Sequence, residues 1–252
     1  MEQREVKWPD EMSANSITEN QVHVWRISLD VGPAGCKSLI SLLSADELNR
    51  VNRLHFTKDQ NRFIIARAAL RQILSHYLCM NPRGIRFAYT PEGKPMLMDD
   101  SGQQKLRFNL SHSGSLAICA VSWGREVGID IEKVKPDIAL EAIIDQFYSP
   151  DEIGVIHKTP EEERKHMFFQ YWVRKEAFLK AIGKGLSFPL NNVDVSRQPG
   201  VEWAPVEVLE SSSKSSSWHG KDLITENGYN AAIVLEHEPG VLQYFDFKDM
   251  GR

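Results

Sequence analysis

The sequence predicts an α+β fold of two pseudo-symmetric halves. Each half is a small antiparallel sheet packed by a long helix, and the active site lies at the seam. Two observations predict this arrangement. The order short helix, long helix, strands occurs twice along the 252 residues, and segments 62–73 and 171–182 can be aligned with Phe63 over Trp172. One helix alignment can arise by chance, but together with the repeated order it favours a duplicated unit of small-domain size.

On this interpretation the chain has three parts: a polar N-terminal arm (1–20), an N-terminal half (21–123) and a C-terminal half (124–252). The arm lacks the apolar centre of a signal peptide. No apolar run approaches the roughly 20 residues that span a bilayer. We therefore expect no membrane partner.

Four capping-box patterns, in which Ser or Thr precedes Glu or Gln by three residues, begin at Ser44, Thr57, Ser149 and Thr159. This pattern is typical of helix starts. The helices expected from it cover 45–54, 58–79, 150–157 and 160–182.

Short runs of apolar residues bounded by turn residues predict strands. The first is Val22–Leu29, which alternates apolar and polar side chains. The others expected are 85–89, 94–98, 106–110, 116–121, 127–132, 201–209, 218–224, 229–235 and 241–247. Residues 210–217 are rich in serine and predict a flexible hairpin loop.

The overall composition excludes some classes of function. Thirty Lys and Arg residues oppose 34 acids, giving a net charge of −4, whereas proteins that coat nucleic acid usually carry a basic excess. We therefore expect no nucleic-acid partner. The three cysteines cannot all pair within the chain and are not spaced as a metal knuckle, which favours a reduced cytoplasmic compartment.

The segment Gly128–Glu132 (GIDIE) is the first candidate for chemistry. Residues two apart on a strand share a face, so Ile129 and Ile131 would pack inward and leave Asp130 and Glu132 together. Two close carboxylates repel each other unless a cation lies between them, and hard oxygen ligands suit Mg²⁺. Taken alone, the pattern is common and fits equally an exposed face with two solvated acids.

The segment Trp172–Lys180 (WVRKEAFLK) is the second candidate. Trp172, Glu176 and Lys180 lie four residues apart and so share one stripe of a helix. A packed Trp172 would make the two charged groups emerge from an anchored face. The alternative is an ordinary Glu–Lys surface pair, worth only a few tenths of a kcal/mol.

Two loops complete the set: Asn109–Ser113 (NLSHS), with hydroxyls and an imidazole that suit phosphate oxygens, and Glu92–Pro95 (EGKP), a tight turn presenting Lys94. Either is also compatible with an ordinary turn. A Walker A loop, GxGxxG and the hydrolase motif GxSxG are absent from the sequence. HExxH and paired CxxC are absent too, which argues against zinc as the metal. An acidic pair, a third carboxylate beside a lysine, and loops with Lys, Ser and His predict a site for a metal and a pyrophosphate.

Together these segments resemble the 4′-phosphopantetheinyl transferases, and in particular the larger Sfp-type members, which are monomers of two pseudo-symmetric halves. GIDIE is similar to the first family motif and Trp172-x-x-Lys-Glu-Ala-x-x-Lys180 to the second. EGKP and Asn109–His112 resemble the two upstream motifs. The resemblance runs from about Val22 to about Leu190 in the family's order and spacing.

The resemblance implies transfer of the phosphopantetheine arm of coenzyme A to a serine of an acyl or peptidyl carrier protein, with release of adenosine 3′,5′-bisphosphate. Asp130, Glu132 and Glu176 would hold Mg²⁺, Glu176 would take the serine proton, and Lys180 would neutralise the leaving phosphate; we count Asp130, Glu176 and Lys180 as catalytic. The residues expected to bind coenzyme A are Arg50, Glu92, Gly93, Lys94, Asn109, Leu110, Ser111, His112 and Lys180.

Two positions depart from the family pattern. Relatives often carry two basic residues a turn apart near Arg50, but here Glu47 occupies the earlier place and Arg53 is a candidate to compensate. Phe63 stands where some relatives have a hydroxyl near the adenine. Two other functions remain open: a Mg²⁺-dependent transferase acting on another diphosphate, and a non-catalytic carrier-protein binder. The intact Asp130, Glu132, Glu176 and Lys180 argue against the second.

Overall fold

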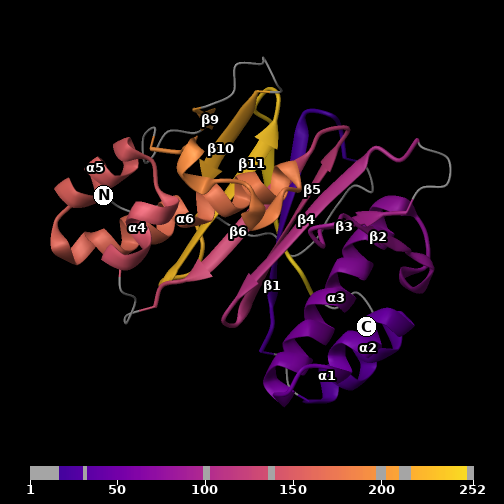
Figure 1. The fold of residues 1–252 in the computed structure, drawn as a ribbon. Helices are drawn as coiled ribbons and strands as arrows, with labels where there is room; N and C mark the ends of the chain where they lie inside the picture. Colours follow the sequence, from indigo (N-terminus) through magenta and orange to yellow (C-terminus); the bar gives the residue numbers. More distant parts are fainter. Residues whose placement is uncertain are drawn as a thin grey trace.

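The computed structural model describes residues 17–30, 33–98, 103–135, 140–196, 203–209 and 217–248. Two four-stranded sheets form the centre, and each carries one long helix (Figure 1). The structure therefore confirms the α+β class with helices packed on mostly antiparallel sheets. Within the described segments, no helix combines the length and apolarity needed to cross a membrane.

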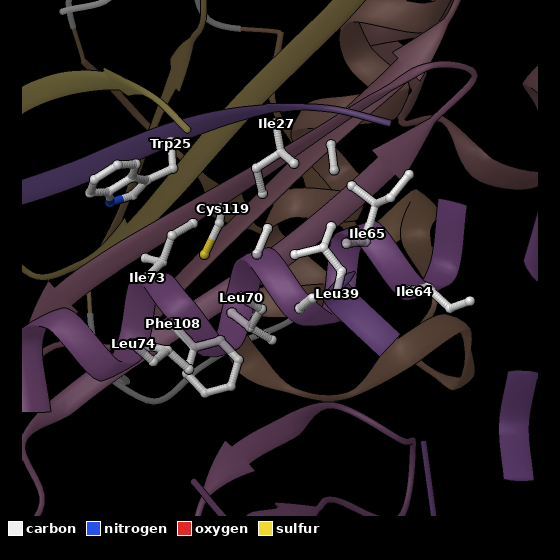
Figure 2. Close-up of a cluster of buried hydrophobic side chains, with 14 of the residues drawn as sticks. Trp25, Ile27, Leu39, Ile64, Ile65, Leu70, Ile73, Leu74, Phe108 and Cys119 are labelled. Atoms are coloured by element: carbon white, nitrogen blue, oxygen red, sulfur yellow. The ribbon is translucent and has the colours of Figure 1, made fainter. Parts of the chain in front are cut away.

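The N-terminal sheet has the strand order β12-β1-β5-β4, namely Val241–Asp246, Gln21–Ser28, Leu116–Trp123 and Leu106–Ser113. Helix α3 (Thr57–Leu78) packs on one face of it through a cluster of buried side chains that includes Trp25, Leu70 and Phe108 (Figure 2). The short elements around this sheet are α1 (Pro33–Leu39), α2 (Ala45–Asn52), β2 (Phe87–Tyr89), β3 (Pro95–Leu97) and the 3₁₀ turns η1 (Ile40–Leu42) and η2 (Pro82–Gly84).

The C-terminal sheet has the order β6-β11-β10-β8, namely Val127–Lys133, Tyr229–Glu236, Trp218–Asp222 and Ala204–Pro205. Helix α6 (Glu161–Ile182) packs on it through a second apolar cluster. A third cluster, with Val24 and Ile118 from one sheet and Ile129 and Ile233 from the other, joins the two sheets. The remaining elements are α4 (Glu141–Phe147), α5 (Pro150–Lys158), β7 (Val193–Asp194), β9 (Glu207–Val208), η3 (Gly185–Ser187) and η4 (Leu190–Asn192).

One strand links the two ends of the chain. Strand β12 follows the C-terminal sheet in sequence, yet it pairs in parallel with β1, at the edge of the N-terminal sheet. Phe245 stacks on Trp25 with ring centroids 4.8 Å apart. The two sheets therefore do not correspond to two continuous segments of the sequence. The division of the chain between residues 123 and 124 stays a prediction, and β12 lies beyond it in sequence although it belongs to the N-terminal sheet.

The two halves share a buried ion pair as well as an order of elements. In the first half, Glu47 accepts from the Ser44 N–H at the start of α2 and pairs with Arg71 of α3 at 2.8 Å. Arg71 also donates to the carbonyls of Pro82 and Ile85, around the 3₁₀ turn that follows its helix.

The second half repeats this arrangement. Glu152 accepts from the Ser149 N–H at the start of α5 and pairs with Lys175 of α6 at 2.7 Å. Lys175 also donates to the carbonyls of Leu190 and Val193, around the corresponding 3₁₀ turn. In both halves a capping-box glutamate therefore fixes the short helix, the long helix and the turn after it, which supports an internal duplication.

Several expected elements differ in the structure. The capping boxes at Ser44 and Ser149 form, but those at Thr57 and Thr159 do not. Thr57 is already the first residue of α3, and the Thr159 hydroxyl donates back to the Val155 carbonyl at the end of α5. The expected strand 201–209 is broken into β8 and β9. Helices α1 and α4 were not predicted, and residues 1–16 of the arm and 210–216 of the serine-rich loop lie outside the described residues.

Candidate active site

Strand β6 presents two acids on the face that α6 covers. Ile129 and Ile131 are fully buried on the opposite face, as the alternation predicts. Gly128 lies on the same face as the acids, where a Cβ atom would come 1.9 Å from the Ala177 carbonyl oxygen. The absence of a side chain at Gly128 therefore lets α6 approach β6 closely enough for its charged stripe to reach Asp130.

Strand β4 runs beside β6 and is joined to it by side chains. Alternate residues of β4 accept hydrogen bonds from alternate N–H groups of β6, as main-chain carbonyls do in a sheet ladder. We call these three bonds the seam ladder. Its rungs are Asn109 Oδ1 with Ile129 N–H (2.9 Å), Ser111 Oγ with Ile131 N–H (3.4 Å) and Ser113 Oγ with Lys133 N–H (3.1 Å). The seam between the halves is thus polar and lies directly beside the acids.

Asp130 is the most deeply buried acid of the site, with 3% of its surface exposed. Its Oδ1 accepts from Lys180 Nζ at 2.5 Å and from Ser111 Oγ at 2.7 Å, and Lys180 also donates to Ser111 at 2.9 Å. The Oδ2 atom is buried and has no hydrogen-bond partner among the described residues. Asp130 is therefore not a solvated surface acid. Leaving its buried Oδ2 without a partner is costly in free energy.

Burial and neighbouring charges shift the pKa values of both Glu176 and Glu132. Burial, together with the negative charges of Asp130 and Glu132 and against the opposing charge of Lys180, raises the pKa of Glu176 to about 7. Burial also raises the pKa of Glu132, as does the charge of Asp130, against a hydrogen bond from Ser113. Asp130, Glu132 and Glu176 thus repel one another electrostatically, and a bound cation would relieve this repulsion.

The donor set fits a divalent metal. Asp130 Oδ2 is an unpaired carboxylate oxygen, and two further carboxylates interact with it electrostatically. Carboxylate oxygens are the ligands that Mg²⁺ prefers. Among the residues described, however, no group of three or more His, Cys, Asp and Glu side chains is already arranged as a metal site. The other oxygen of Asp130, Oδ1, accepts a hydrogen bond from Lys180 Nζ.

His112 lies at the mouth of the seam and keeps access to solvent. Desolvation by neighbouring protein atoms lowers the pKa of His112, and the positive charges of Lys180, Arg62 and Arg50 lower it further. Several cations thus gather around a ring that remains neutral near pH 7. This concentration of positive charge suits a polyanionic ligand.

Arg50 lies in a separate pocket at the end of α2. The pocket has a volume of about 650 Å³ and includes Arg53, Phe63, Tyr89 and Gly93 in its lining. The Arg50 guanidinium lies over the Phe63 ring, 5.6 Å from its centroid. Arg53 therefore supplies a second basic group here.

Glu47, at the place where relatives often carry a base, has a structural role. It is buried and pairs with both Arg67 and Arg71. Its negative charge is thus neutralised by Arg67 and Arg71 of α3, although Glu47 also forms part of the lining of the pocket beside Arg50. The departure at Glu47 from the family pattern is explained by the duplicated ion pair.

The EGKP turn reaches the seam through its lysine. Lys94 Nζ donates to Glu126 and to the carbonyl of Ala181, both at 3.0 Å. The acceptor Ala181 directly follows Lys180, so Lys94 fixes the C-terminal end of α6. Gly93 adopts a φ of +86° in the turn, and Glu92 lies against Gly185.

The expected residues are therefore only partly brought together. Asp130, Glu132, Glu176, Lys180 and Ser111 form one cluster, with His112 beside it. Leu110 points away from this cluster into the apolar core under α3, and Asn109 is a rung of the seam ladder.

Sequence reasoning missed one polar residue at the seam, Glu126, and expected a different role for Ser113. The Ser113 hydroxyl was expected to suit phosphate oxygens, whereas in the structure it donates to Glu132; its spacing of two from Ser111 is a sign that both lie on one face of the strand. The pairing of Glu126 with Lys94 and Arg107 had no signal in the sequence, because the partners lie 32 and 19 residues away.

Comparison with known proteins points to one family. Residues 126–234 match the model of the 4′-phosphopantetheinyl transferase superfamily, and residues 33–124 match the model described as 4′-phosphopantetheinyl transferase, N-terminal. The 4′-phosphopantetheinyl transferase HetI of Nostoc sp. is 36% identical over 87% of this chain and 90% of its own length. The 4′-phosphopantetheinyl transferase Sfp of Bacillus subtilis is 30% identical over 79% of this chain and 84% of its own length.

Proposed function

The chain belongs to the 4′-phosphopantetheinyl transferase superfamily, and on that premise we propose that it uses coenzyme A and Mg²⁺ to modify a serine of an apo carrier protein. The family establishes an enzyme that transfers phosphopantetheine to carrier proteins. The proposal adds that the phosphopantetheine comes from coenzyme A and that adenosine 3′,5′-bisphosphate leaves.

The observation that carries the proposal is the unpaired, buried Oδ2 of Asp130. Asp130, Glu132 and Glu176 would hold Mg²⁺, which would supply charge neutralisation at the pyrophosphate. Without a cation, three carboxylates would repel a substrate that is itself a polyanion. A bound divalent cation would therefore explain why three acids lie at a site proposed to bind an anionic substrate.

The chain's own groups then divide the work of the reaction. Glu176 is proposed to accept the proton of the attacking serine; in the metal-free protein burial and neighbouring charges raise its pKa to about 7. Lys180, held by Asp130 and Ser111, would donate to the phosphate that leaves. Phosphoryl-type transfer needs positioning and charge neutralisation more than covalent help, and these groups provide both.

Binding of coenzyme A would draw on the basic groups beside the acids. Arg50 and Arg53, in the pocket with Phe63, and His112 at the seam are proposed to contact its phosphates. Glu92, Gly93 and Lys94, with the backbone of Asn109–Ser111, are proposed to enclose its adenine and ribose.

The expected partners are an acyl or peptidyl carrier protein and coenzyme A, with no nucleic acid and no membrane. We propose that the enzyme works as a monomer, because the acidic strand and the charged helix of the site both come from one chain. We propose a cytoplasmic location from the number and spacing of the cysteines. Fatty-acid, polyketide and nonribosomal-peptide carriers all remain candidate substrates.

A second candidate, a Mg²⁺-dependent transferase for another diphosphate, would use the same acids but not a 3′-phosphate. The bases Arg50 and Arg53 favour the first candidate. Comparing coenzyme A with 3′-dephospho-coenzyme A separates the two: a large fall in kcat/KM for the dephospho form supports coenzyme A, and equal values support the alternative.

The reaction itself is tested by following adenosine 3′,5′-bisphosphate with an apo carrier protein, coenzyme A and Mg²⁺. We expect its release to match carrier modification one to one and to stop when a chelator is added. Release that continues without a divalent cation would contradict the proposed metal site. Excess Mg²⁺ restoring the rate after chelation is the control for damage to the protein.

A further inference from the structure

Ser113 links the two strands of the seam at the position of Glu132. Its hydroxyl donates to Glu132 Oε2 at 2.7 Å and accepts from the Lys133 N–H at 3.1 Å. The hydroxyl is therefore oriented by the main chain of the same strand that carries the acid. A hydroxyl fixed in this way presents its proton to Glu132 in one direction.

We infer that Ser113 is a positioning residue that orients the Glu132 carboxylate toward the shared cation. This inference rests on the proposed function, because the cation is part of that proposal. Groups that hydrogen-bond to a metal ligand fix its orientation, and their loss commonly weakens metal binding by about 10-fold or more. With Oε2 held by Ser113, the rotation of Glu132 is restricted and its other oxygen is left for the metal.

Ser113 is separable from the chemistry in a way that Ser111 is not. The Ser111 hydroxyl is shared between Asp130 and Lys180, so its removal disturbs two proposed catalytic groups at once. The hydrogen bonds recorded for Ser113 involve Glu132 and one main-chain N–H. Ser113 is also on β4, in the other half of the molecule from Glu132, so the metal site would be completed only when the halves are joined.

The alternative is that Ser113 serves only as a rung of the seam ladder. A purely structural rung would affect thermal stability and leave the affinity for metal unchanged. A positioning residue would instead change the affinity for metal, and a high metal concentration would restore the rate.

The test compares three variants with the unmodified protein. Ser113→Ala removes the hydroxyl, and Ser113→Thr keeps it on a residue that suits a strand. Ser115→Ala is the matched control, because its hydroxyl lies in the same turn but bonds to Tyr229 at 3.1 Å rather than to an acid. Two quantities are measured. The first is the Kd for Mn²⁺ binding to the protein in the presence of one equivalent of coenzyme A, obtained from the EPR signal of free Mn²⁺. The second is the Mg²⁺ concentration that gives half the maximal rate.

We expect Ser113→Ala to raise both quantities by about 10-fold. Saturating Mg²⁺ should return its rate to within about two-fold of the unmodified protein, and Ser113→Thr and Ser115→Ala should stay within about two-fold in both measurements. If Ser113→Ala matches the unmodified protein while that protein requires the metal, the inference is overturned and the proposed function stands. If the unmodified protein neither binds Mn²⁺ nor needs a divalent cation, the proposed metal site fails and the inference fails with it.

Discussion

The two oxygens of Asp130 lie in different surroundings. Oδ1 accepts from Lys180 and Ser111, whereas Oδ2 is buried without a partner among the described residues. If Asp130 served only as a structural ion-pair partner, both of its oxygens would be expected to accept hydrogen bonds from Lys180 or from neighbouring polar groups. The unpaired oxygen is what points to a further ligand at this position.

Glu176 gives the first prediction at the scale of the residue. Burial, then the charges of Asp130 and Glu132, raise its pKa from 4.5 to about 7. The folded protein therefore keeps a proton that the unfolded chain releases, so the free energy of unfolding falls as pH rises from about 4.5 to about 7. Glu176→Gln does not titrate and should lack this fall.

Urea unfolding of both proteins in metal-free buffer between pH 4.5 and pH 8 measures this difference. The stability of the unmodified protein relative to Glu176→Gln should decrease up to about pH 7 and then level off. Parallel pH profiles for the two proteins would show that the carboxylate has an ordinary pKa and would contradict the account of its surroundings.

Lys180 gives the second prediction. Its ammonium group donates to Asp130 and Ser111 and is proposed to reach the leaving phosphate, where charge develops during transfer. Lys180→Ala should lower kcat by about 100-fold and change the KM for coenzyme A much less. Steady-state kinetics with a carrier protein measures both constants. A rise confined to KM would mean that the lysine binds substrate without assisting the chemistry.

At the scale of the element, the contact of α6 with β6 depends on Gly128. A Cβ atom there would lie 1.9 Å from the Ala177 carbonyl oxygen and 2.4 Å from the Ala181 nitrogen, so the helix would have to move. Gly128→Ala should reduce the free energy of unfolding by about 3 kcal/mol and should reduce activity as well, because Lys180 moves away from Asp130.

Gly154 provides the matched control, since a Cβ at this position of α5 meets nothing within 4 Å. Gly154→Ala should keep full activity and gain up to about 1 kcal/mol from helix propensity. Thermal and urea unfolding measure both variants. Equal stability of Gly128→Ala and the unmodified protein would contradict the close packing of this helix on the strand.

The sequence was sufficient for elements whose signals are local. The alternation in β6 predicted which face carries Asp130, and the boxes at Ser44 and Ser149 predicted two helix starts. The box at Thr159 failed because its hydroxyl donates to the Val155 carbonyl instead, and the box at Thr57 failed because Thr57 is already the first residue of α3. Local patterns do not decide between competing hydrogen bonds.

The site was predicted less completely than the fold. The spacing of Glu176 and Lys180 on one helical stripe was enough to place them together. The seam ladder was not predicted, because side chains of β4 replace a main-chain ladder to β6 and nothing local marks this. The burial of Glu47 also depended on two arginines of another helix.

At the scale of the whole molecule, β12 ties the end of the C-terminal half to the N-terminal sheet. Phe245 is 7% exposed and stacks on Trp25 across the two strands. Parallel pairing between segments 220 residues apart, as for Arg26 and Asp246, cannot be read from a local pattern.

Removing the anchor of this strand gives the fourth prediction. Phe245→Ala should cost about 3 kcal/mol because it leaves a cavity beside Trp25, and the loss should appear in the unfolding of both halves. Val241 on the same strand is 56% exposed, so Val241→Ala should cost less than about 1 kcal/mol. Calorimetry measures both variants. Equal, small losses would show that β12 does not hold the halves together.

The net charge of −4 is now seen to be unevenly distributed. The positive charges of Lys180, Arg62 and Arg50 act on His112, and the three acids interact with one another and with Lys180. The two groups are suited to the two parts of one ligand, the phosphates and the metal that neutralises them. This arrangement is a property of the assembled halves, since the acids and Lys180 come from the C-terminal half and Arg50 and Arg62 from the N-terminal half.

The most direct test of the account is intact-protein mass spectrometry of an apo carrier protein incubated with coenzyme A, Mg²⁺ and either the unmodified enzyme or Asp130→Asn. This variant keeps the shape of the side chain and removes the charge that the cation needs. We predict that the carrier gains one phosphopantetheine with the unmodified enzyme and none at equal time with Asp130→Asn, while both enzymes remain folded by circular dichroism. A carrier modified at a similar rate by Asp130→Asn would contradict the central claim that this buried acid binds the metal for transfer.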